Sequence, residues 1–407
     1  MEISGLDKNK NYIIKTGLTI NGEGAHTPGG TFYIEEGRIL ALASGGHDRL
    51  CFKHPNRATT VLNLDHLTAL PPLVDCHVHL ALDGNVLNAA RRNRAHPGEM
   101  DRQVSGVMKD ILEHGILAVR DGGDRDGIAL RYRDKVASGE MEGPVIRSPE
   151  SALRKTGTYG AFLGPGMAMD KLDETLDRMV AKKVDLVKVI VSGVVSFKEY
   201  GRVGPTQYTA GELAAIVEGA RARGLPVMAH ASGDAAVRLA VEAGVHTVEH
   251  GYFTSRESLA LMAERNIPWI PTVIPVAARL NKPPEHGGPD RRERLVVEKT
   301  VDRQLATISE AASMGVTLGI GTDAGAPGVR HGHGYLEELF LYSRAGLSPA
   351  GIISCATINS AGILGLDWGC LEAGRPAVLL LVDGDPRQDI AALAKVKHLF
   401  RPLQKGV

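Results

Sequence analysis

Short apolar runs recur through the middle of the chain, and most are separated by helix-like segments. Thr209 and Glu212 form a capping-box pair ahead of one such segment, which Gly224 closes, and Ser348-Pro349 opens another. This alternation is typical of parallel strands joined by helices. Strands are expected at residues 71–79, 116–122, 144–149, 184–192, 225–231, 245–250, 267–273 and 316–323. Eight strands alternating with helices predict an α/β fold, specifically a TIM-like (β/α)8 barrel.

The two ends of the chain carry a different pattern. Residues 11–66 contain short β-prone runs broken by turns, and the stretch from about residue 367 onward looks similar. We therefore expect residues 1–66 and 367–407 to form one small β-sandwich domain beside a barrel domain of residues 67–366. The Pro- and charge-rich stretch 275–295 interrupts the rhythm, and we expect a loop at the barrel rim there, a candidate lid.

Composition narrows the class of protein. The chain has 407 residues, of which 43% are hydrophobic, and its 47 Lys+Arg balance its 47 Asp+Glu. No net charge therefore attracts nucleic acid or an anionic membrane. An apolar segment long enough to span a bilayer is also lacking, so we expect a cytoplasmic location. Four cysteines without a C-x-x-C pair indicate neither a disulfide framework nor a zinc knuckle.

Candidate metal ligands coincide with the ends of the predicted strands. His77 and His79 stand at positions i and i+2, which place both rings on one face of a strand. Barrel enzymes carry their chemistry at the carboxyl ends of the strands, so residues at the other ends should converge on this pair. Those residues are Lys188, His230, His250 and Asp323.

Each candidate also has a structural explanation when it is taken alone. His230 could be a hydrogen-bonded core histidine, and Asp323 could cap a helix. Glu249, directly before His250, could be a hydrogen-bonding partner of the site or a surface charge. All these structural explanations would have to hold at once, so a metal site explains the pattern better.

Lys188 is the most informative of these residues. Its neighbours in 186-LVKVIV-191 are apolar and β-prone, so the amine should be buried on a parallel strand. Burial favours the neutral amine. A neutral lysine amine can react with carbon dioxide to give a carbamate, whose oxygens can bridge two metal ions. The alternative is a structural lysine held by a salt bridge.

These motifs together resemble the amidohydrolase superfamily, in its branch of imidazolonepropionase-related and prolidase-like proteins with a carboxylated lysine. The resemblance implies two divalent metal ions, with zinc as the default and manganese or iron suited to the same ligands. It assigns His77, His79 and Asp323 to one ion, His230 and His250 to the other, and carboxylated Lys188 between them. The blocks that carry the resemblance occur in the family's order: LPPLVDCHVHL, VKVIVSG, GLPVMAHASG, AVEAGVHTVEHG, GTDAGAPGVRHGHG and GDPRQDIAALAKV.

The chain departs from its relatives in loops that should face the substrate. In 156-TGTYGAF-162, Tyr159 stands where relatives have a substrate-contacting histidine. The stretch SGVVSFKEYGR replaces the more usual Gly-Gly-containing loop after Lys188. Tyr252, Arg330 and His331 also follow ligand-bearing strand ends and are candidate substrate contacts, unless they are ordinary loop residues.

The resemblance implies a hydrolase in which Asp323 moves a proton from the attacking water to the leaving amine. The first hypothesis is cleavage of an amide bond in a dipeptide (Xaa-Pro-like) or an N-acyl amino acid. The second is hydrolysis or deamination of a nitrogen heterocycle such as an imidazolone-like ring. A third is a silent scaffold that only binds partners. We expect a small-molecule substrate and a homo-oligomer, and neither a nucleic-acid nor a membrane partner.

Overall fold

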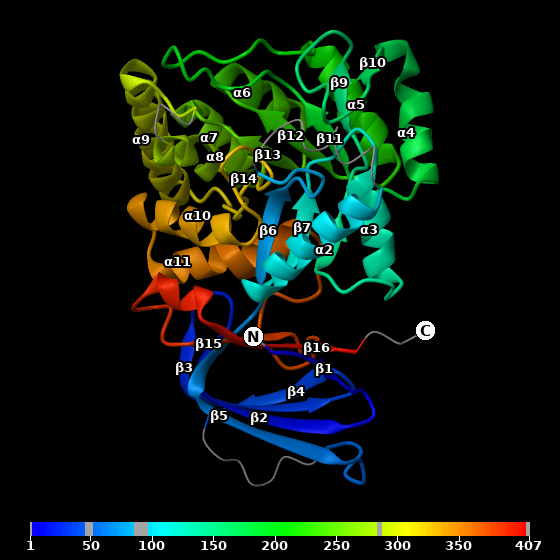
Figure 1. Ribbon diagram of the computed structural model, residues 1–407, viewed down its shortest axis with the longest axis vertical. Helices are drawn as coiled ribbons and strands as arrows, with labels where there is room; N and C mark the ends of the chain where they lie inside the picture. The colour runs from blue at the N-terminus through cyan, green and yellow to red at the C-terminus, as the bar shows by residue number, and fades with distance from the viewer. Residues whose placement is uncertain (1, 45–51, 85–96, 283–286, 404–407) are drawn as a thin grey trace.

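The computed structural model describes residues 2–44, 52–84, 97–282 and 287–403. Figure 1 shows an upper region, in which helices surround strands, and a lower region made of strands from both ends of the chain. The chain passes from one region to the other between two consecutive strands. β5 (Thr59–Leu70) belongs to the lower region and β6 (Leu73–Val78) to the upper one. Within the described residues, no helix is long and apolar enough to cross a membrane.

The lower region is a seven-stranded sheet in the order β1-β16-β15-β5-β2-β3-β4. The predicted pairing of the two chain ends is confirmed, since β15 pairs antiparallel with β5 and places Leu380 opposite Leu70. The division of this sheet into the two layers of a sandwich stays a prediction. Its strands are β1 (Glu2–Leu6), β2 (Asn11–Ile20), β3 (His26–Glu35), β4 (Arg38–Ala43), β5, β15 (Leu379–Asp383) and β16 (Val396–Pro402).

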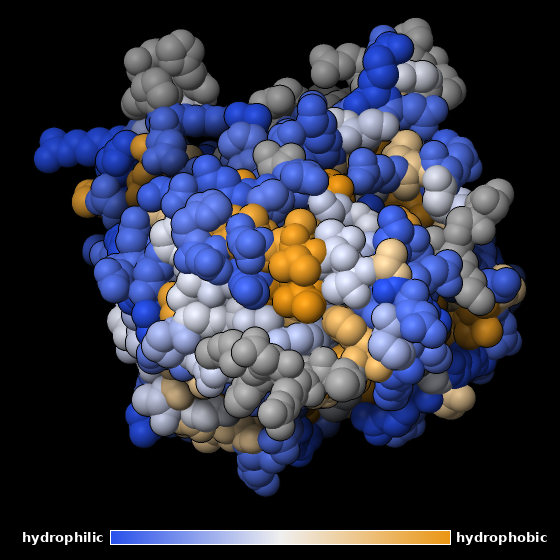
Figure 2. Space-filling model, turned by 90° about the horizontal axis from the view of Figure 1, so that it is seen from below, coloured by the Kyte–Doolittle hydropathy of each residue, from blue (hydrophilic) through white to orange (hydrophobic). Residues whose placement is uncertain are grey.

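The buried side chains of this sheet form a hydrophobic cluster of their own, which includes Phe32, Ile34 and Leu381. Figure 2 views the molecule from this lower end, where blue and white atoms cover most of the face and a small orange area lies near its centre. The lower end therefore presents a mainly polar surface.

The upper region contains two sheets of parallel strands, in the orders β10-β9-β11-β12-β13-β14 and β6-β7-β8. Every residue of β6, β7, β11, β12 and β13 is buried, as expected for parallel strands covered on both faces. The apolar runs predicted as strands between residues 71 and 273 are confirmed, although β9 and β10 were not expected. The bounds are β7 (Ile116–Asp121), β8 (Val145–Arg147), β9 (Ala152–Lys155), β10 (Gly166–Met167), β11 (Val187–Ile190), β12 (Val227–Ala231), β13 (Thr247–His250) and β14 (Trp269–Ile270).

The stretch 316–323, expected as the eighth strand, is not a regular strand and makes only isolated bridges. It nevertheless lies between the two parallel sheets. The amide of Trp269 in β14 donates to Thr317 O (2.9 Å), and the amide of Cys76 in β6 donates to Ile320 O (2.7 Å). Packing is tight here, because a Cβ on Gly321 would lie 2.4 Å from a side-chain carbon of Ile270.

Helices follow most of the parallel strands and cover their outer faces (Figure 1). The predicted capping box of α5 is confirmed, with Thr209 and Glu212 each bonded to the other's backbone, and Ser348 caps α11. The helices are α2 (Pro97–Glu113), α3 (Ile128–Ala137), α4 (Leu172–Ala181), α5 (Ala210–Ala222), α6 (Asp234–Ala243), α7 (Arg256–Glu264), α8 (Ile274–Ala277), α9 (Arg291–Ser313), α10 (His333–Arg344), α11 (Pro349–Ser354) and α12 (Ser360–Ile363).

The prediction that residues 275–295 form a loop is wrong for most of that stretch. It contains α8, the short helix η2 (Ala278–Asn281) and the start of α9, while residues 283–286 lie outside the described part of the chain. Pro275 occupies the first turn of α8, where proline is tolerated, and Asp290 forms a capping box with Glu293 at the start of α9.

Candidate metal centre

The six predicted metal ligands converge on one cavity of about 340 Å³. They come from different strands and meet here because the carboxyl ends of parallel strands lie at one edge of a sheet. β6 supplies His77 and is followed by His79, and β11, β12 and β13 supply Lys188, His230 and His250. Asp323 ends the irregular stretch after residue 316. The structure thus brings together all six side chains, which lie far apart in the sequence.

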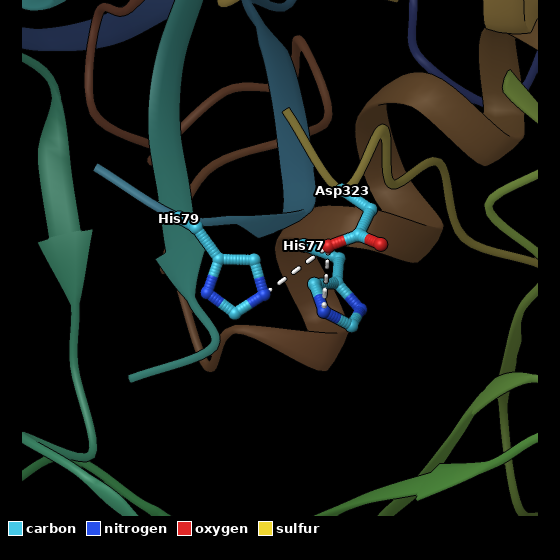
Figure 3. A group of neighbouring side chains, drawn as sticks. All are labelled: His77, His79 and Asp323. Carbon is cyan, nitrogen blue, oxygen red and sulfur yellow. Dashed lines mark ion pairs between the residues drawn. The ribbon is translucent and has the colours of Figure 1, made fainter. Parts of the chain in front are cut away.

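His77, His79 and Asp323 form the tightest part of this cluster. Figure 3 shows both imidazole rings beside the Asp323 carboxylate. Asp323 Oδ1 lies 3.1 Å from His79 Nε2 and 3.6 Å from His77 Nε2. One ligand atom from each residue lies within 4.8 Å of the others. Two imidazole nitrogens and one carboxylate oxygen at such separations suit a divalent transition metal.

Lys188, His230 and His250 extend the cluster from His77. The Lys188 amine lies 3.3 Å from His77 Nε2. The ring centroid of His250 lies 5.0 Å from that of His77 and 4.4 Å from that of His230. Lys188 and His250 therefore both lie beside His77, and His230 lies beside His250.

Hydrogen bonds show that Nδ1 carries a proton in three of the histidines. His77 Nδ1 lies 2.8 Å from a carboxylate oxygen of Glu249, and His79 Nδ1 lies 3.2 Å from the carbonyl oxygen of Gly123. Both partners only accept, so Nδ1 must carry the proton.

His250 follows the same rule, because Thr272 Oγ1, which lies 2.7 Å from His250 Nδ1, donates its own proton to Pro271 O. The Nε2 lone pairs of His77 and His250 are left available for a metal, whereas Nε2 of His79 faces the Asp323 carboxylate. His230 differs, since its Nε2 lies 3.2 Å from Ser232 Oγ.

Burial keeps three of the four histidines neutral. For His79 burial also lowers the pKa, but the hydrogen bond to Asp323 outweighs it, so that this pKa is raised above the usual value. Burial, together with the charge of Lys188, lowers the pKa of His77 well below its usual range and that of His230 to about 3. Burial lowers the pKa of His250 strongly and that of Lys188 to about 8. Burial opposes ionisation of Asp323, but the neighbouring His77 and His79 lower its pKa below the usual value. Neutral imidazoles and an ionised carboxylate are the protonation states that bind metal.

The backbone is strained at three positions around the cavity. His250, Thr272 and Asp323 have φ angles of 71°, 49° and 52°, in the left-handed region that side chains other than glycine rarely adopt. Such conformations cost about 1–3 kcal/mol each and cluster at functional sites. Here they turn the chain at strand ends so that His250 and Asp323 face the cavity.

A buried ion pair supports His77 from behind. Glu249 is fully buried, so it is a partner of the site and not a surface charge. Its second oxygen lies 2.8 Å from Arg120, which also donates to the carbonyl of Cys76 and to Thr247. Arg120 was missed from the sequence, where it reads as an ordinary charge at the end of an apolar run.

The comparison with known families agrees with this geometry. The model of the amidohydrolase family matches residues 68–404, which is most of the chain. The chain belongs to the amidohydrolase family. It is therefore an enzyme that hydrolyses C–N bonds of amide-like groups, in a family whose members generally use metal ions.

Individual relatives are distant but match over most of their length. Ochratoxinase of Aspergillus niger is 26% identical, over 99% of this amidohydrolase and 88% of the relative. An imidazolonepropionase of Rubrobacter xylanophilus is 25% identical, over 83% and 81%. A solved Xaa-Pro dipeptidase with bound methionine superposes with a TM-score of 0.81 over 96% of this chain and 98% of the other, at 23% identity, and so shares the fold.

The predicted substrate contacts divide into two pairs. Tyr159 and Tyr252 line the cavity, with ring centroids 5.9 Å from His230 and 5.9 Å from His250, respectively. Arg330 and His331 do not line it. Arg330 is exposed, and His331 is buried with Nε2 3.1 Å from Leu82 O.

Among the described residues, the arginine that lines the amidohydrolase cavity is Arg279, in η2. The sequence did not single it out, because the Pro- and charge-rich stretch around it indicated only a loop at the barrel rim.

Proposed function

We propose that this amidohydrolase is a binuclear metal-dependent hydrolase that cleaves the amide bond of a small substrate, either a dipeptide (Xaa-Pro-like) or an N-acyl amino acid. The observation that carries the proposal is the convergence of six ligand-type side chains on one cavity. A single tetrahedral site needs four ligands at most, so six favour two ions. The number of ions and the nature of the substrate are the parts to be tested.

The donor set fits the proposed metals. His77, His79 and Asp323 would hold one ion and His230 and His250 the other, with zinc as the first choice and manganese or iron as alternatives. Lys188 would join the two sides as a carbamate. Its neutral amine adds to carbon dioxide, forms a C–N bond and releases one proton, which replaces a buried amine with an anionic oxygen donor. The position of the Lys188 amine beside His77 Nε2 supports this assignment.

The residues of the chain would then share the work of catalysis. The bound metal ions would lower the pKa of a water molecule and polarise the substrate carbonyl. Asp323, whose lowered pKa keeps it ionised at neutral pH, would take a proton from the attacking water and pass it to the leaving amine. Glu249 would hold the His77 ring in place, and Tyr159 and Tyr252 would contact the substrate.

We also propose that the two parallel sheets and residues 317–324 form one closed (β/α)8 barrel of residues 67–366, with a separate domain of residues 1–66 and 367–407. The hydrogen bonds of residues 317–324 to both β14 and β6 support closure on one side. On the other side, Asp185 N, just before β11, donates to Ser148 O, just after β8 (2.9 Å).

Hydrolysis or deamination of a nitrogen heterocycle is a second candidate function. The similarity to an imidazolonepropionase favours it. Lys188 weighs against a mononuclear deaminase, which has no use for a bridging carbamate.

A substrate screen separates the two candidates. The protein, loaded with zinc or manganese, would be incubated with dipeptides, N-acyl amino acids and imidazolone-type rings, and release of free amine or ring opening would be measured. We expect turnover of one or more amides that chelator-treated protein does not show. Turnover confined to heterocycles would support the second candidate, and turnover of none of the three classes would contradict both.

A further inference from the structure

Arg279 has a charge without a partner in the wall of the candidate metal cavity. Its guanidinium carbon lies 4.1 Å from the centroid of the Phe197 ring, and its Nε is buried without a hydrogen-bond partner. Among the residues that the structure describes, no carboxylate forms an ion pair with Arg279.

An arginine in this state is suited to bind an anion. The guanidinium carries a fixed charge, and Arg279 is only partly exposed, so the charge is poorly compensated by solvent on the side of its buried Nε. Asp323 is the one acidic residue among the described residues that line the cavity, and its carboxylate already lies against His77 and His79. The described part of the chain therefore offers no internal partner, which leaves the guanidinium free to pair with an anionic group of a ligand.

The surroundings of Arg279 also define how that anion would be bound. Phe197, in the loop between β11 and α5, covers one face of the guanidinium, a contact that holds the planar group in a fixed orientation. The N–H groups point outward along the edge of that plane, which is the geometry that binds a carboxylate through two parallel hydrogen bonds.

The rest of the wall is mainly apolar. Phe162, Leu163, Val195 and Val276 line the same cavity. A ligand that fills this space therefore combines an apolar body with one negatively charged group.

We propose that Arg279 binds the free carboxylate of the substrate, so that the enzyme selects amides with an apolar side group and a carboxylate near the scissile bond. This assignment rests on the proposed amide hydrolysis for the identity of the substrate. It also replaces Arg330, a candidate substrate contact from the sequence that does not line the cavity.

A ligand without a hydrolysable bond tests the assignment directly. Metal-loaded protein would be titrated calorimetrically with 4-phenylbutyrate and with the neutral alcohol 4-phenylbutanol, which differ in the charged group. We expect the acid to bind about 10- to 100-fold more tightly, as charge-assisted hydrogen bonds imply. In Arg279→Met the affinity for the acid should fall by a similar factor, while the affinity for the alcohol stays within about twofold.

Two further variants keep the test informative. Arg279→Lys retains the charge with fewer donors and should lose only part of the preference, which also covers the case that the Met variant fails to fold. Arg238→Met removes an exposed arginine on α6 and should leave the preference unchanged. An unchanged preference in folded Arg279→Met, no preference in the unaltered protein, or loss of preference in Arg330→Met alone would each overturn the assignment.

The outcome separates this inference from the proposed function. If amides are hydrolysed but kcat/KM for an acid over its carboxamide is the same in Arg279→Met, the carboxylate assignment fails and amide hydrolysis stands. If no amide is hydrolysed but the anion preference depends on Arg279, the site still binds carboxylates and the proposed reaction fails.

Discussion

Lys188 lies in the middle of the cluster, and its chemical state decides whether two metal ions can fill it. An ammonium ion about 4 Å from a divalent ion would repel it by roughly 8 kcal/mol at an effective dielectric constant of about 20, whereas a carbamate would attract it. We predict that Lys188→Ala loses metal and activity, and that acetate or formate at high concentration, added with metal, partly restores both by occupying the vacated space. Metal analysis and an amide hydrolysis assay would measure this.

Lys188→Arg provides the matched control for that prediction. Arginine cannot form a carbamate and brings a fixed positive charge into the same space, so the acids should not rescue it. Full metal content in unrescued Lys188→Ala would show that the lysine is not a bridge.

Asp323 is predicted to be needed for proton transfer more than for folding. Asp323→Asn keeps the size of the side chain and can coordinate weakly, but an amide cannot accept the proton. Turnover should fall by about 10²–10⁴-fold. The comparison requires metal content and thermal stability to be measured on the same sample. Near-normal turnover with both metals bound would exclude Asp323 as the proton shuttle.

The metal ligands of the site could be predicted from the sequence better than the residues around them. His77, His79, Lys188, His230, His250 and Asp323 were identifiable because strand ends in parallel folds converge, so sequence position is enough to place them. Of the contacts that orient them, Glu249 was a candidate from the sequence, but Arg120 was not, since it pairs with Glu249 across 129 positions of sequence. Arg279 could not be found either, because its significance lies in the absence of a partner, which depends on the tertiary structure.

At the scale of secondary structure, Glu338 of α10 anchors the segment that carries Arg279. Its two carboxyl oxygens accept from the amides of Val273 (2.9 Å) and Ile274 (2.7 Å), where α8 begins. We predict that Glu338→Gln leaves one of these buried amides without an acceptor and lowers the free energy of unfolding by about 1–3 kcal/mol. It should also raise KM, because α8 and η2 form one wall of the cavity.

The pH dependence of this variant gives an independent check. Burial raises the pKa of Glu338 from its ordinary 4.5 to about 8. The folded state then holds a proton that the unfolded chain releases, so the contribution of Glu338 to stability is full below pH 4.5 and is lost as the pH rises through about 8. The stability difference between the unaltered protein and Glu338→Gln should therefore shrink from pH 6 to pH 9 in denaturant titrations. A difference that grows over this range would contradict the assignment.

Secondary-structure elements were predictable where local signals and tertiary packing agree. The capping box of α5 and the fully buried strands belong to this class. The stretch 316–323 has a strand-like composition, but close packing against β14 and the left-handed φ of Asp323 prevent a regular strand. In 275–295, Pro275 lies in the first turn of α8 and not in a loop, and the pairing of Asp290 with Glu293 was overlooked.

At the scale of the whole molecule, metal binding should stabilise the fold, because the ligands come from strands spread between residues 77 and 323. An ion present at 100 times its Kd contributes about 2.7 kcal/mol. We predict that zinc or manganese raises the Tm of chelator-treated protein by several degrees and that close to two ions bind per chain. Calorimetry and metal analysis would measure both. Saturation near one ion would contradict the binuclear proposal.

The sheet formed by the two ends of the chain has a consequence for the order of events during synthesis. β5 pairs with β15, and Leu70 faces Leu380, so the ribosome must add more than 300 residues before β5 gains this neighbour. β1 waits still longer, until β16 emerges. During that interval β5 exposes an open edge on which a strand of another nascent chain could pair. Slow translation or a shortened C-terminus should therefore favour aggregation over folding, even though every proposed metal ligand has already been made.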